Sequence, residues 1–325
     1  MHAEKPDLHR RVLVALLVVQ LCFSSLHLVG KIVLRELPPF ALAGMRLLLA
    51  TPVLLLLAWR RDRLIPPRRD WPTLALLGLF GITANQLLFL SGLSLTSASS
   101  ASVLMPSIPV FTAGAAVILG LERWSWPRFG GVTLAVLGAL VLLDPGHLES
   151  GTRAVLGNSL ILLNCLSYSV YLVVQRPVLL RLPWRTVIAW TFLFGTLGAL
   201  PWTAASLFAT GWGALQPVTI AGVLWIALVP TALAFSLNSW ASRRTDASVV
   251  AAFTTLQPLL TILVAIPLLG EKPSWNQGVG FLLIAAGLVV VRQARAIPPT
   301  SPPKLSISDE PDRLPVEPLS KGETE

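Results

Sequence analysis

Two stretches of the chain, TSASSASVLMPSIPVFTAGAAVILGLERWSW (Thr96–Trp126) and TDASVVAAFTTLQPLLTILVAIPLLGEKPSW (Thr245–Trp275), match one another in register without a gap. The coinciding residues are prolines, acids, tryptophans and, just beyond, glycines: Pro109 with Pro258, Glu122 with Glu271, Trp126 with Trp275, Gly131 with Gly280, and Gly138 with Gly287. Apolar segments resemble one another in composition, but they rarely align such different residue types at one constant offset. The chain therefore contains an internal repeat, and this repeat decides the predicted fold.

The composition indicates a polytopic membrane protein. Of the 325 residues, 54% are hydrophobic and 13% are charged, and the mean hydropathy is +0.71. Soluble domains usually carry about 25% charged residues. Apolar runs of membrane-spanning length recur along the chain, and most charges lie between them. The net charge of +9 comes from basic residues that flank these runs, so no nucleic-acid partner is expected.

We expect an all-α fold with ten transmembrane helices, because about 20 apolar residues form a helix long enough to cross the hydrocarbon layer. The helices are predicted over residues 12–34, 39–59, 71–91, 97–119, 127–143, 155–175, 186–208, 218–240, 247–268 and 275–291. They form two five-helix repeats, 12–143 and 155–292, joined by an external connector at 144–154. Residues 1–11 precede the first repeat, and the Pro-rich residues 293–325 are expected to form a disordered tail.

The second repeat is predicted to be inverted relative to the first. Five helices per copy is an odd number, so the second copy enters the membrane from the opposite side. The loop after the second helix carries five arginines, whereas its counterpart after the seventh helix carries no charge. Inverted repeats are typical of secondary transporters, in which one copy rocks against the other around a site at the membrane midplane.

The distribution of Lys and Arg predicts that both termini are cytoplasmic. With the N-terminus inside, the inner side receives Lys5, Arg10, Arg11, Arg60, Arg61, Arg63, Arg68, Arg69, Arg123, Arg128, Arg176, Arg181, Arg185, Arg243, Arg244, Arg292 and Arg295. The outer side receives only Lys31, Arg35, Arg153 and Lys272.

Several local features accompany the ten-helix, two-repeat layout. Lys31 lies late in the first helix, Pro38 and Pro39 precede Arg46 in the second, and the repeated segments end in Leu-Glu and Gly-Glu. Over residues 10–293 the sequence resembles the drug/metabolite transporter superfamily, specifically the EamA-type permeases. It departs from the usual first helix of that family, where a Trp-Gly pair and an Asn precede the Lys, because Phe23-Ser24 and Leu26 stand there. The resemblance implies a metabolite exporter of the cell inner membrane.

Two polar stripes are the principal candidates for a substrate path. Gln20, Ser24, His27 and Lys31 in the first helix have the same spacing as Asn164, Tyr168, Tyr171 and Gln175 in the sixth. This spacing keeps each set on one helical face. Because polar groups are costly in a membrane, we interpret both stripes as lining the cavity between the repeats. The alternative is hydrogen bonding between helices, worth about 0.6 kcal/mol per contact.

Further candidates lie in other spans. Lys31 and Arg46 both approach the outer leaflet, with Glu36 as a candidate partner between them, and Arg46 lies deeper and is predicted to have an internal role. Asn85, Gln86, Asn238 and Gln257 are weaker candidates for the substrate site. His27 could couple transport to a proton, although a structural histidine is the simpler alternative. The prolines of the repeated segments, Pro106, Pro109 and Pro258, are interpreted as kinks that shape the pathway.

The residues absent from the spans restrict the function. Asp and Glu lie near span ends, which disfavours a transporter that uses a buried carboxylate to bind a cationic drug. We find no phosphate-binding loop, metal-ligand cluster or catalytic arrangement, so no cofactor, no metal and no enzymatic activity are expected. The leading hypothesis is alternating-access transport of amino-acid-like or other small organic solutes. The alternatives are a membrane enzyme of lipid metabolism, or a channel or scaffold without active transport.

The expected partners follow from this hypothesis. They are a small-molecule substrate, the lipid bilayer, and either a proton or an exchanged solute as the coupled species. The protein is expected to act as a monomer or a homodimer.

Overall fold

A computed structural model of the chain describes residues 4–62, 65–96, 101, 104–121, 125–143, 151–211, 213, 215–260 and 275–293. These residues are helical and contain no strand, as the composition predicts. Six of the described helical segments are long and apolar enough to cross a membrane: Leu8–Val33, Pro39–Arg61, Arg68–Leu95, Thr152–Arg181, Trp184–Ala209 and Pro217–Ser242. The protein is thus an all-helical, multi-pass membrane protein. The residues beyond 293 and most of the predicted connector lie outside the described residues.

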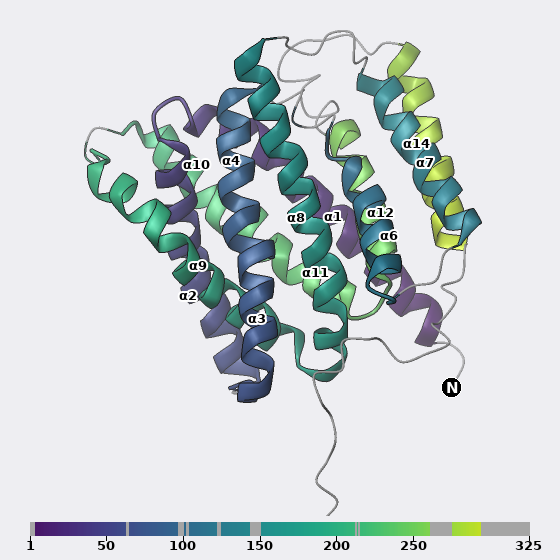
Figure 1. The fold of residues 1–325 in the computed structure, drawn as a ribbon, viewed down its shortest axis with the longest axis horizontal. Helices are drawn as coiled ribbons and strands as arrows, with labels where there is room; N and C mark the ends of the chain where they lie inside the picture. The colour runs from purple at the N-terminus through teal and green to yellow at the C-terminus, as the bar shows by residue number, and fades with distance from the viewer. Residues whose placement is uncertain are drawn as a thin grey trace, which may run out of the picture.

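The first half of the chain supplies α1 (Glu4–Val33), α2 (Pro39–Arg61), η1 (Arg68–Asp70), α3 (Trp71–Gly78), η2 (Leu79–Ala84), α4 (Asn85–Leu95), α6 (Ser107–Ile118) and α7 (Trp126–Leu143). The second half supplies α8 (Thr152–Arg181), α9 (Trp184–Ala209), α10 (Pro217–Ile226), η5 (Ala227–Leu233), α11 (Ala234–Ser242), α12 (Ala247–Ala252), η6 (Phe253–Thr255) and α14 (Trp275–Gln293). Figure 1 shows these helices as one bundle, with α7 and α14 together at one side.

Two long spans are interrupted by π-helical turns, η2 in the third predicted helix and η5 in the eighth. Shifted by the offset that relates Thr96 to Thr245, the residues of η2 fall within η5. π-turns inside α-helices often mark functional sites, because they leave backbone carbonyls without helical partners. Here the side chain of Ser167 donates a hydrogen bond of 2.7 Å to the carbonyl of Phe80 inside η2.

The prolines predicted to kink the repeated helices lie at or shortly after irregular turns, with Pro109 inside the first turn of α6. Pro106 follows a turn at Met105, and α6 begins at the next residue. Pro258 lies four residues after Thr254, which is in the 3₁₀ turn η6. A proline lacks the N–H that would bond the carbonyl four residues earlier, and its ring crowds that carbonyl. The helix therefore tightens at η6.

The helices α7 and α14 pack closely and run antiparallel. A Cβ atom on Gly138 would lie 2.8 Å from the carbonyl oxygen of Gly280, and a Cβ atom on Gly287 would lie 2.6 Å from that of Gly131. The four glycines in these contacts are the same four that coincide in the sequence repeat, although each contact joins a glycine to a residue other than its own counterpart. Only glycine permits backbones to approach this closely, as at other membrane helix interfaces.

The helices α2 and α9 also run antiparallel. Gly44 packs against Thr203, and the hydroxyls of Thr51 and Thr196 share a hydrogen bond of 2.7 Å near the middle of both helices. At the end of α2, Asp62 forms an ion pair of 3.4 Å with Arg185 at the start of α9.

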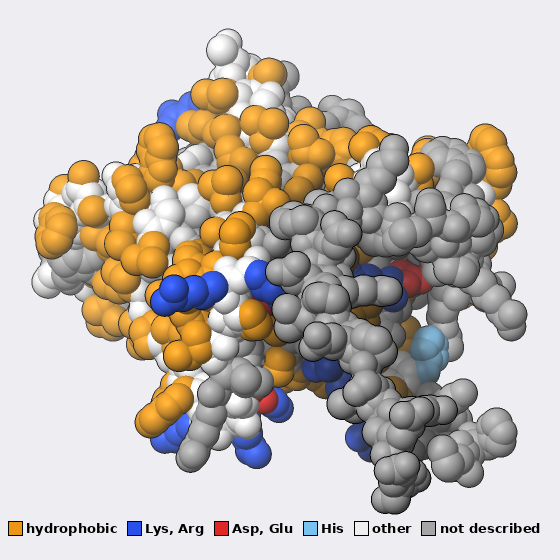
Figure 2. Space-filling view, turned by 60° about the horizontal axis from the view of Figure 1, so that its bottom comes forward, with side chains coloured by type: hydrophobic (Ala, Val, Ile, Leu, Met, Phe, Trp, Pro, Cys, Tyr) orange, Lys and Arg blue, Asp and Glu red, His pale blue; other side chains and the backbone are white. Residues whose placement is uncertain are grey.

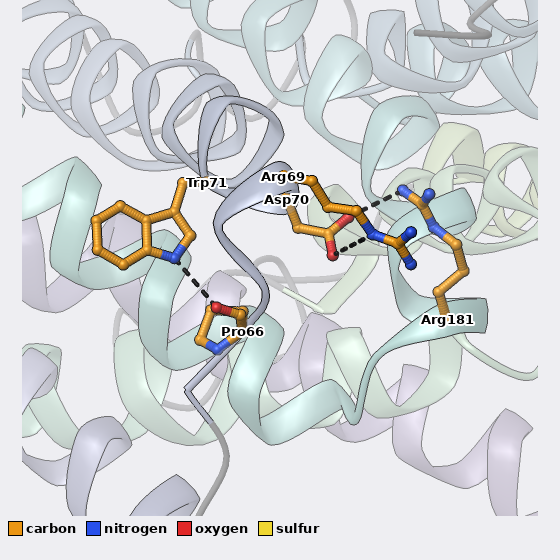
Figure 3. Close-up of polar contacts among 5 residues, drawn as sticks. All are labelled: Pro66, Arg69, Asp70, Trp71 and Arg181. Carbon is orange, nitrogen blue, oxygen red and sulfur yellow. Dashed lines mark hydrogen bonds and ion pairs between the residues drawn. The ribbon is translucent and has the colours of Figure 1, made fainter. Parts of the chain in front are cut away.

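A second ion pair joins the two halves at the same end of the bundle. Figure 3 shows Asp70 of η1 between Arg69 and Arg181, with the Arg181 guanidinium 3.3 Å from its carboxylate. The indole N–H of Trp71 donates to the carbonyl of Pro66 and fixes the turn before α3. Figure 2 views this end and shows Lys and Arg side chains spread across it, beside flanks covered by hydrophobic side chains.

Candidate functional site

A cavity of about 50 Å³ lies inside the bundle, between residues of both halves of the chain. Its polar lining consists of His27, Arg46, Asn85, Gln86, Asn164, Tyr168 and Gln257. All seven were singled out from the sequence, and α1, α2, α4, α8 and the segment after η6 bring them together. The cavity is much smaller than the pockets of about 300–1,000 Å³ that usually bind small molecules. A cavity of this size would have to widen before it could hold a metabolite.

The first polar stripe faces the interior, as predicted, up to His27. Gln20, Ser24 and His27 are each 1% exposed. The side chain of Gln257 donates a 2.8 Å hydrogen bond to that of Gln20, and Ser24 donates one of 3.2 Å to the backbone carbonyl of Gln257. These two stripe residues therefore join α1 to the segment after η6, while His27 lines the cavity. Lys31 is partly buried near the end of α1 and does not line the cavity.

The second polar stripe is buried along its whole length. Asn164 and Tyr168 line the cavity, and Asn164 also donates a 2.8 Å hydrogen bond to the carbonyl of Asn85, next to η2. Tyr171 packs against the Tyr168 ring, and Gln175 donates to the hydroxyl of Ser242 on α11. Asn164 thus combines the two roles considered for the stripes, cavity lining and helix-to-helix hydrogen bonding.

Arg46 is fully buried and is held by a residue that sequence reasoning missed. Its Nε and Nη2 groups donate hydrogen bonds of 3.0 and 2.7 Å to the hydroxyl of Thr231 in η5. That hydroxyl in turn donates a bond of 2.6 Å to the carbonyl of Ile226. The carbonyl needs this donor because Pro230, four residues later, has no N–H to offer. Pro230 therefore favours the π-turn, and the hydroxyl of the following Thr231 accepts the hydrogen bonds of the Arg46 guanidinium.

Arg46 has no ion-pair partner within the described part of the chain, and its Nη1 atom makes no hydrogen bond there. Glu36 does not pair with Arg46, so that half of the prediction is wrong, whereas a pairing of Glu36 with Lys31 stays a prediction. Glu36 lies at the opposite end of the bundle from the ion pairs, where it accepts a 3.2 Å hydrogen bond from the backbone N–H of Gln216. Arg46 lies about two turns into α2 and is fully buried, which separates it from that surface carboxylate.

The geometry assigns the tautomer of His27. Its Nδ1 atom lies 3.1 Å from the carbonyl oxygen of Phe23, which can only accept, so Nδ1 carries the proton. The Nε2 atom is buried and has no hydrogen-bond partner among the described residues. The Phe89 ring packs edge-on against the imidazole, with ring centroids 5.4 Å apart. His27 can therefore offer a lone pair in its neutral form.

Aromatic side chains form one wall of the cavity, which was not predicted. Phe23, Phe89 and Phe235 line it, and the Phe235 ring packs against both Phe23 and Tyr168, at centroid distances of 5.6 and 6.3 Å. No sequence signal distinguishes these rings, because phenylalanine is equally common on the lipid-facing side of a membrane helix. The site thus combines one buried cation with a broad apolar surface.

Asn238 is buried on α11 but does not line the cavity. Neither its amide nitrogen nor its amide oxygen has a hydrogen-bond partner among the described residues. Among these residues there is also no group of three or more His, Cys, Asp or Glu side chains that could hold a metal ion.

Comparison with known proteins identifies the family. Over residues 10–144, and again over residues 155–293, the sequence matches the EamA-like transporter family. The chain belongs to this family. The predicted resemblance to EamA-type permeases of the drug/metabolite transporter superfamily is thereby confirmed. As an EamA-like protein the chain is a membrane transporter of small molecules and not an enzyme.

Several relatives of this EamA-like transporter have been named. An uncharacterized transporter of Archaeoglobus fulgidus is 30% identical over 84% of this chain and 94% of its own length. A probable terminal-alkyne amino-acid exporter of Streptantibioticus cattleyicolor is 30% identical over 70% of this chain and 75% of its own. A probable amino-acid metabolite efflux pump of Salmonella typhimurium is 27% identical, with coverages of 85% and 92%.

The fold also matches a known crystal structure. The TM-score is 0.70 at 20% sequence identity, over 87% of this chain and 98% of the other. At this identity the match shows a common fold and nothing about the substrate.

Proposed function

We propose that this protein is a secondary transporter that exports small organic solutes carrying a carboxylate, amino-acid-like ones above all, across the inner membrane by alternating access. The observation that carries the proposal is Arg46, a buried cation that lines the central cavity without an acidic partner in the described residues.

The electrostatics of the cavity favour an anionic group. A charged side chain in the middle of a membrane span costs about 2.5–3.5 kcal/mol on insertion scales. Thr231 offsets part of this cost through two hydrogen bonds but supplies no negative charge. Among the residues that the structure describes, no Asp or Glu lines the cavity. A carboxylate on the solute would provide both the missing charge and an acceptor for Nη1, in a charge-assisted hydrogen bond.

The aromatic wall favours a solute that also has an apolar part. Phe23, Phe89 and Phe235 offer apolar surface beside the guanidinium, so a carboxylate and a hydrophobic side chain could be bound together. The Streptantibioticus and Salmonella relatives are named as a probable terminal-alkyne amino-acid exporter and a probable amino-acid metabolite efflux pump, and these names support the same solute class and the outward direction.

The proposed architecture is ten membrane helices in two inverted repeats, 12–143 and 155–292. The repeats are joined by an external connector at 144–154 and flanked by cytoplasmic segments at 1–11 and 293–325. The twofold match to the family and the antiparallel packing of α7 on α14, and of α2 on α9, support it. Equivalent helices in inverted copies run in opposite directions, as these do.

The small size of the central cavity supports a carrier rather than a channel. A carrier must open its site to one side at a time, and a cavity of about 50 Å³ has to widen before it admits a metabolite. The energy would come from a proton or an exchanged solute, and His27 is the candidate proton acceptor because its Nε2 lone pair lacks a partner.

Counterflow in proteoliposomes tests this proposal. Vesicles loaded with a mixture of unlabelled amino acids should accumulate labelled amino acid transiently, which a channel cannot do. Carboxamide analogues should compete poorly. Arg46→Gln should lower the apparent affinity about tenfold or more, since hydrogen bonds to charged groups are worth about 1.5–3 kcal/mol. Arg153→Gln, which removes an exposed arginine, is the control.

Two results would contradict the proposal. One is the absence of exchange with any carboxylate-bearing solute by protein that is folded and reconstituted. The other is equal competition by the acid and its carboxamide, which would exclude a carboxylate contact with Arg46.

A further inference from the structure

A second, larger hollow lies on the flank of the bundle, at the end that carries the ion pairs. This groove has a volume of about 480 Å³ and shares no residue with the central cavity. It runs along the beginning of α1, beside the start of α9, and α11 contributes to its lining. The residues that define its chemistry are Arg10, Arg11, Val14, Val18, Trp184 and Trp240.

The groove is amphipathic along its length. Arg10 and Arg11 are exposed at one end, and the next turns of α1 present Val14, which is 51% exposed, and Val18. Apolar side chains exposed on the flank of a membrane helix face the acyl chains. The groove therefore opens toward the lipid, with its basic end at the membrane surface.

Two further guanidinium groups lie against the tryptophans of the groove. Arg244 lies over the Trp240 ring at 4.2 Å from its centroid, and Arg185, which is paired with Asp62, lies over the Trp184 ring at 4.7 Å. Partial burial, and then repulsion from Arg243, lower the pKa of Arg244 from its ordinary value. Among the residues that the structure describes, the groove is lined by arginines and by no Asp or Glu, so its charge is complementary to a phosphate group.

We propose that the groove binds an anionic phospholipid of the cytoplasmic leaflet, with the phosphate at Arg10 and Arg11 and an acyl chain along Val14 and Val18. The assignment to this leaflet rests on the topology in the proposed function. Basic pockets beside membrane helices at the cytoplasmic surface suit anionic headgroups, and the two tryptophans suit the headgroup level. A soluble acidic partner would satisfy the arginines but not the apolar wall below them.

The proposal is tested by lipid retention, measured on the full-length protein without reference to transport. Purified protein is equilibrated with equal amounts of phosphatidylglycerol and phosphatidylethanolamine, and the bound lipids are counted by native mass spectrometry. Wild-type protein should retain phosphatidylglycerol preferentially. Arg10→Gln with Arg11→Gln should lower this preference by about tenfold or more, at about 1 kcal/mol per basic residue near a membrane surface.

The chain offers a matched control, because Arg60 and Arg61 form another exposed arginine pair at the end of a membrane helix. Arg60→Gln with Arg61→Gln removes the same charge at the same end of the bundle and should leave the preference intact. Val18→Trp fills the groove without changing the charge and should also reduce retention. Thermal unfolding of each variant verifies that it is folded.

The outcomes separate the possibilities. If the Arg10/Arg11 and Arg60/Arg61 variants lose the preference for phosphatidylglycerol equally, the lipid is attracted by the general charge of this face, and the proposal is overturned. Unchanged retention of phosphatidylglycerol by the Arg10/Arg11 variant would overturn it as well. Since binding is measured directly, failure here leaves the transport proposal untouched. A transporter without amino-acid exchange could conversely still bind the lipid.

Discussion

Thr51 and Thr196 share a hydrogen bond of 2.7 Å at the crossing of α2 and α9, and they occupy equivalent places in the two halves of the chain. Leu37-Pro38 precedes Thr51 by the same number of residues as Leu182-Pro183 precedes Thr196. A residue that contacts its own counterpart lies close to an axis relating the two halves. In the proposed alternating-access mechanism, this crossing would be the pivot between the two halves.

The ion pair between Asp62 and Arg185 lies at the end of the same helix pair, and charge reversal should reveal its role. Asp62→Arg places two arginines together and should lower the thermal unfolding temperature, whereas Asp62→Arg with Arg185→Asp should restore most of the loss. Both side chains are partly exposed, so the pair is worth about 1 kcal/mol or less. Thermal unfolding in detergent measures the effect. If the double variant is no more stable than the single one, the pair contributes nothing.

Thr231 is expected to position Arg46 for its ligand. Thr231→Val keeps the shape of the side chain but removes the acceptor for Nε and Nη2, so the apparent KM for a carboxylate solute should rise about tenfold, as expected for charge-assisted hydrogen bonds. Thr231→Ser keeps the hydroxyl and should behave like wild type. Initial rates of uptake into proteoliposomes check this.

A purely structural role for Thr231 predicts a different pattern. The valine variant would then lose thermal stability and maximal rate, while the KM of the remaining transport would stay unchanged. The uncharged carboxamide analogue is an internal control, because its weak transport should not respond to Thr231→Val.

Gly81 should tolerate no larger residue. A Cβ atom there would lie 2.3 Å from Cδ2 of the Tyr171 ring, so Gly81→Ala should destabilise the protein by about 1–3 kcal/mol through overpacking. Gly114→Ala is the control, since a Cβ at that helical position meets no atom of the described residues within 4 Å, and alanine favours the helix by up to about 1 kcal/mol. Equal unfolding temperatures for the two variants would show that α8 can shift away from η2.

Much of the site could be predicted because polar residues in an apolar chain are conspicuous. Gln20, His27, Asn164 and Arg46 stand out in their spans, and helical spacing alone directs the two stripes inward. The structure buries these residues as expected. The repeat could also be recognised from the sequence. Prolines and glycines that coincide at one constant offset stand out among apolar residues, which match one another in almost any alignment.

The rest could not be predicted because it depends on how the backbone departs from an ideal helix. The π-turn at Pro230 directs Thr231 toward Arg46, and nothing in the periodicity of an apolar helix indicates such a turn. Phe235 and its neighbours could have faced lipid as easily as the cavity. The sequence suggests Glu36 as a partner between Lys31 and Arg46, but Glu36 bonds the backbone of Gln216 while Arg46 is fully buried.

An added carboxylate in the cavity should inhibit transport by competing for Arg46. Gln86 lines the same small cavity, so Gln86→Glu places a negative charge near the guanidinium. Neutralising that charge removes the attraction for a carboxylate solute, and the apparent KM should rise about tenfold or more, the equivalent of about 1.4 kcal/mol. Gln86→Met conserves volume without charge and should have a smaller effect. Gln216→Glu adds the same charge at an exposed position and should have none.

The response to Gln86→Glu distinguishes an anion site from a general polar site. If Arg46 only stabilises the bundle, the new carboxylate should pair with it and raise the thermal unfolding temperature while leaving the KM unchanged. If Arg46 binds the solute, affinity for the carboxylate should fall and affinity for the carboxamide should be kept, because only the former needs the guanidinium. Measuring competition by both solutes in the same vesicles decides between these outcomes, since a defect in folding or reconstitution would lower both signals together.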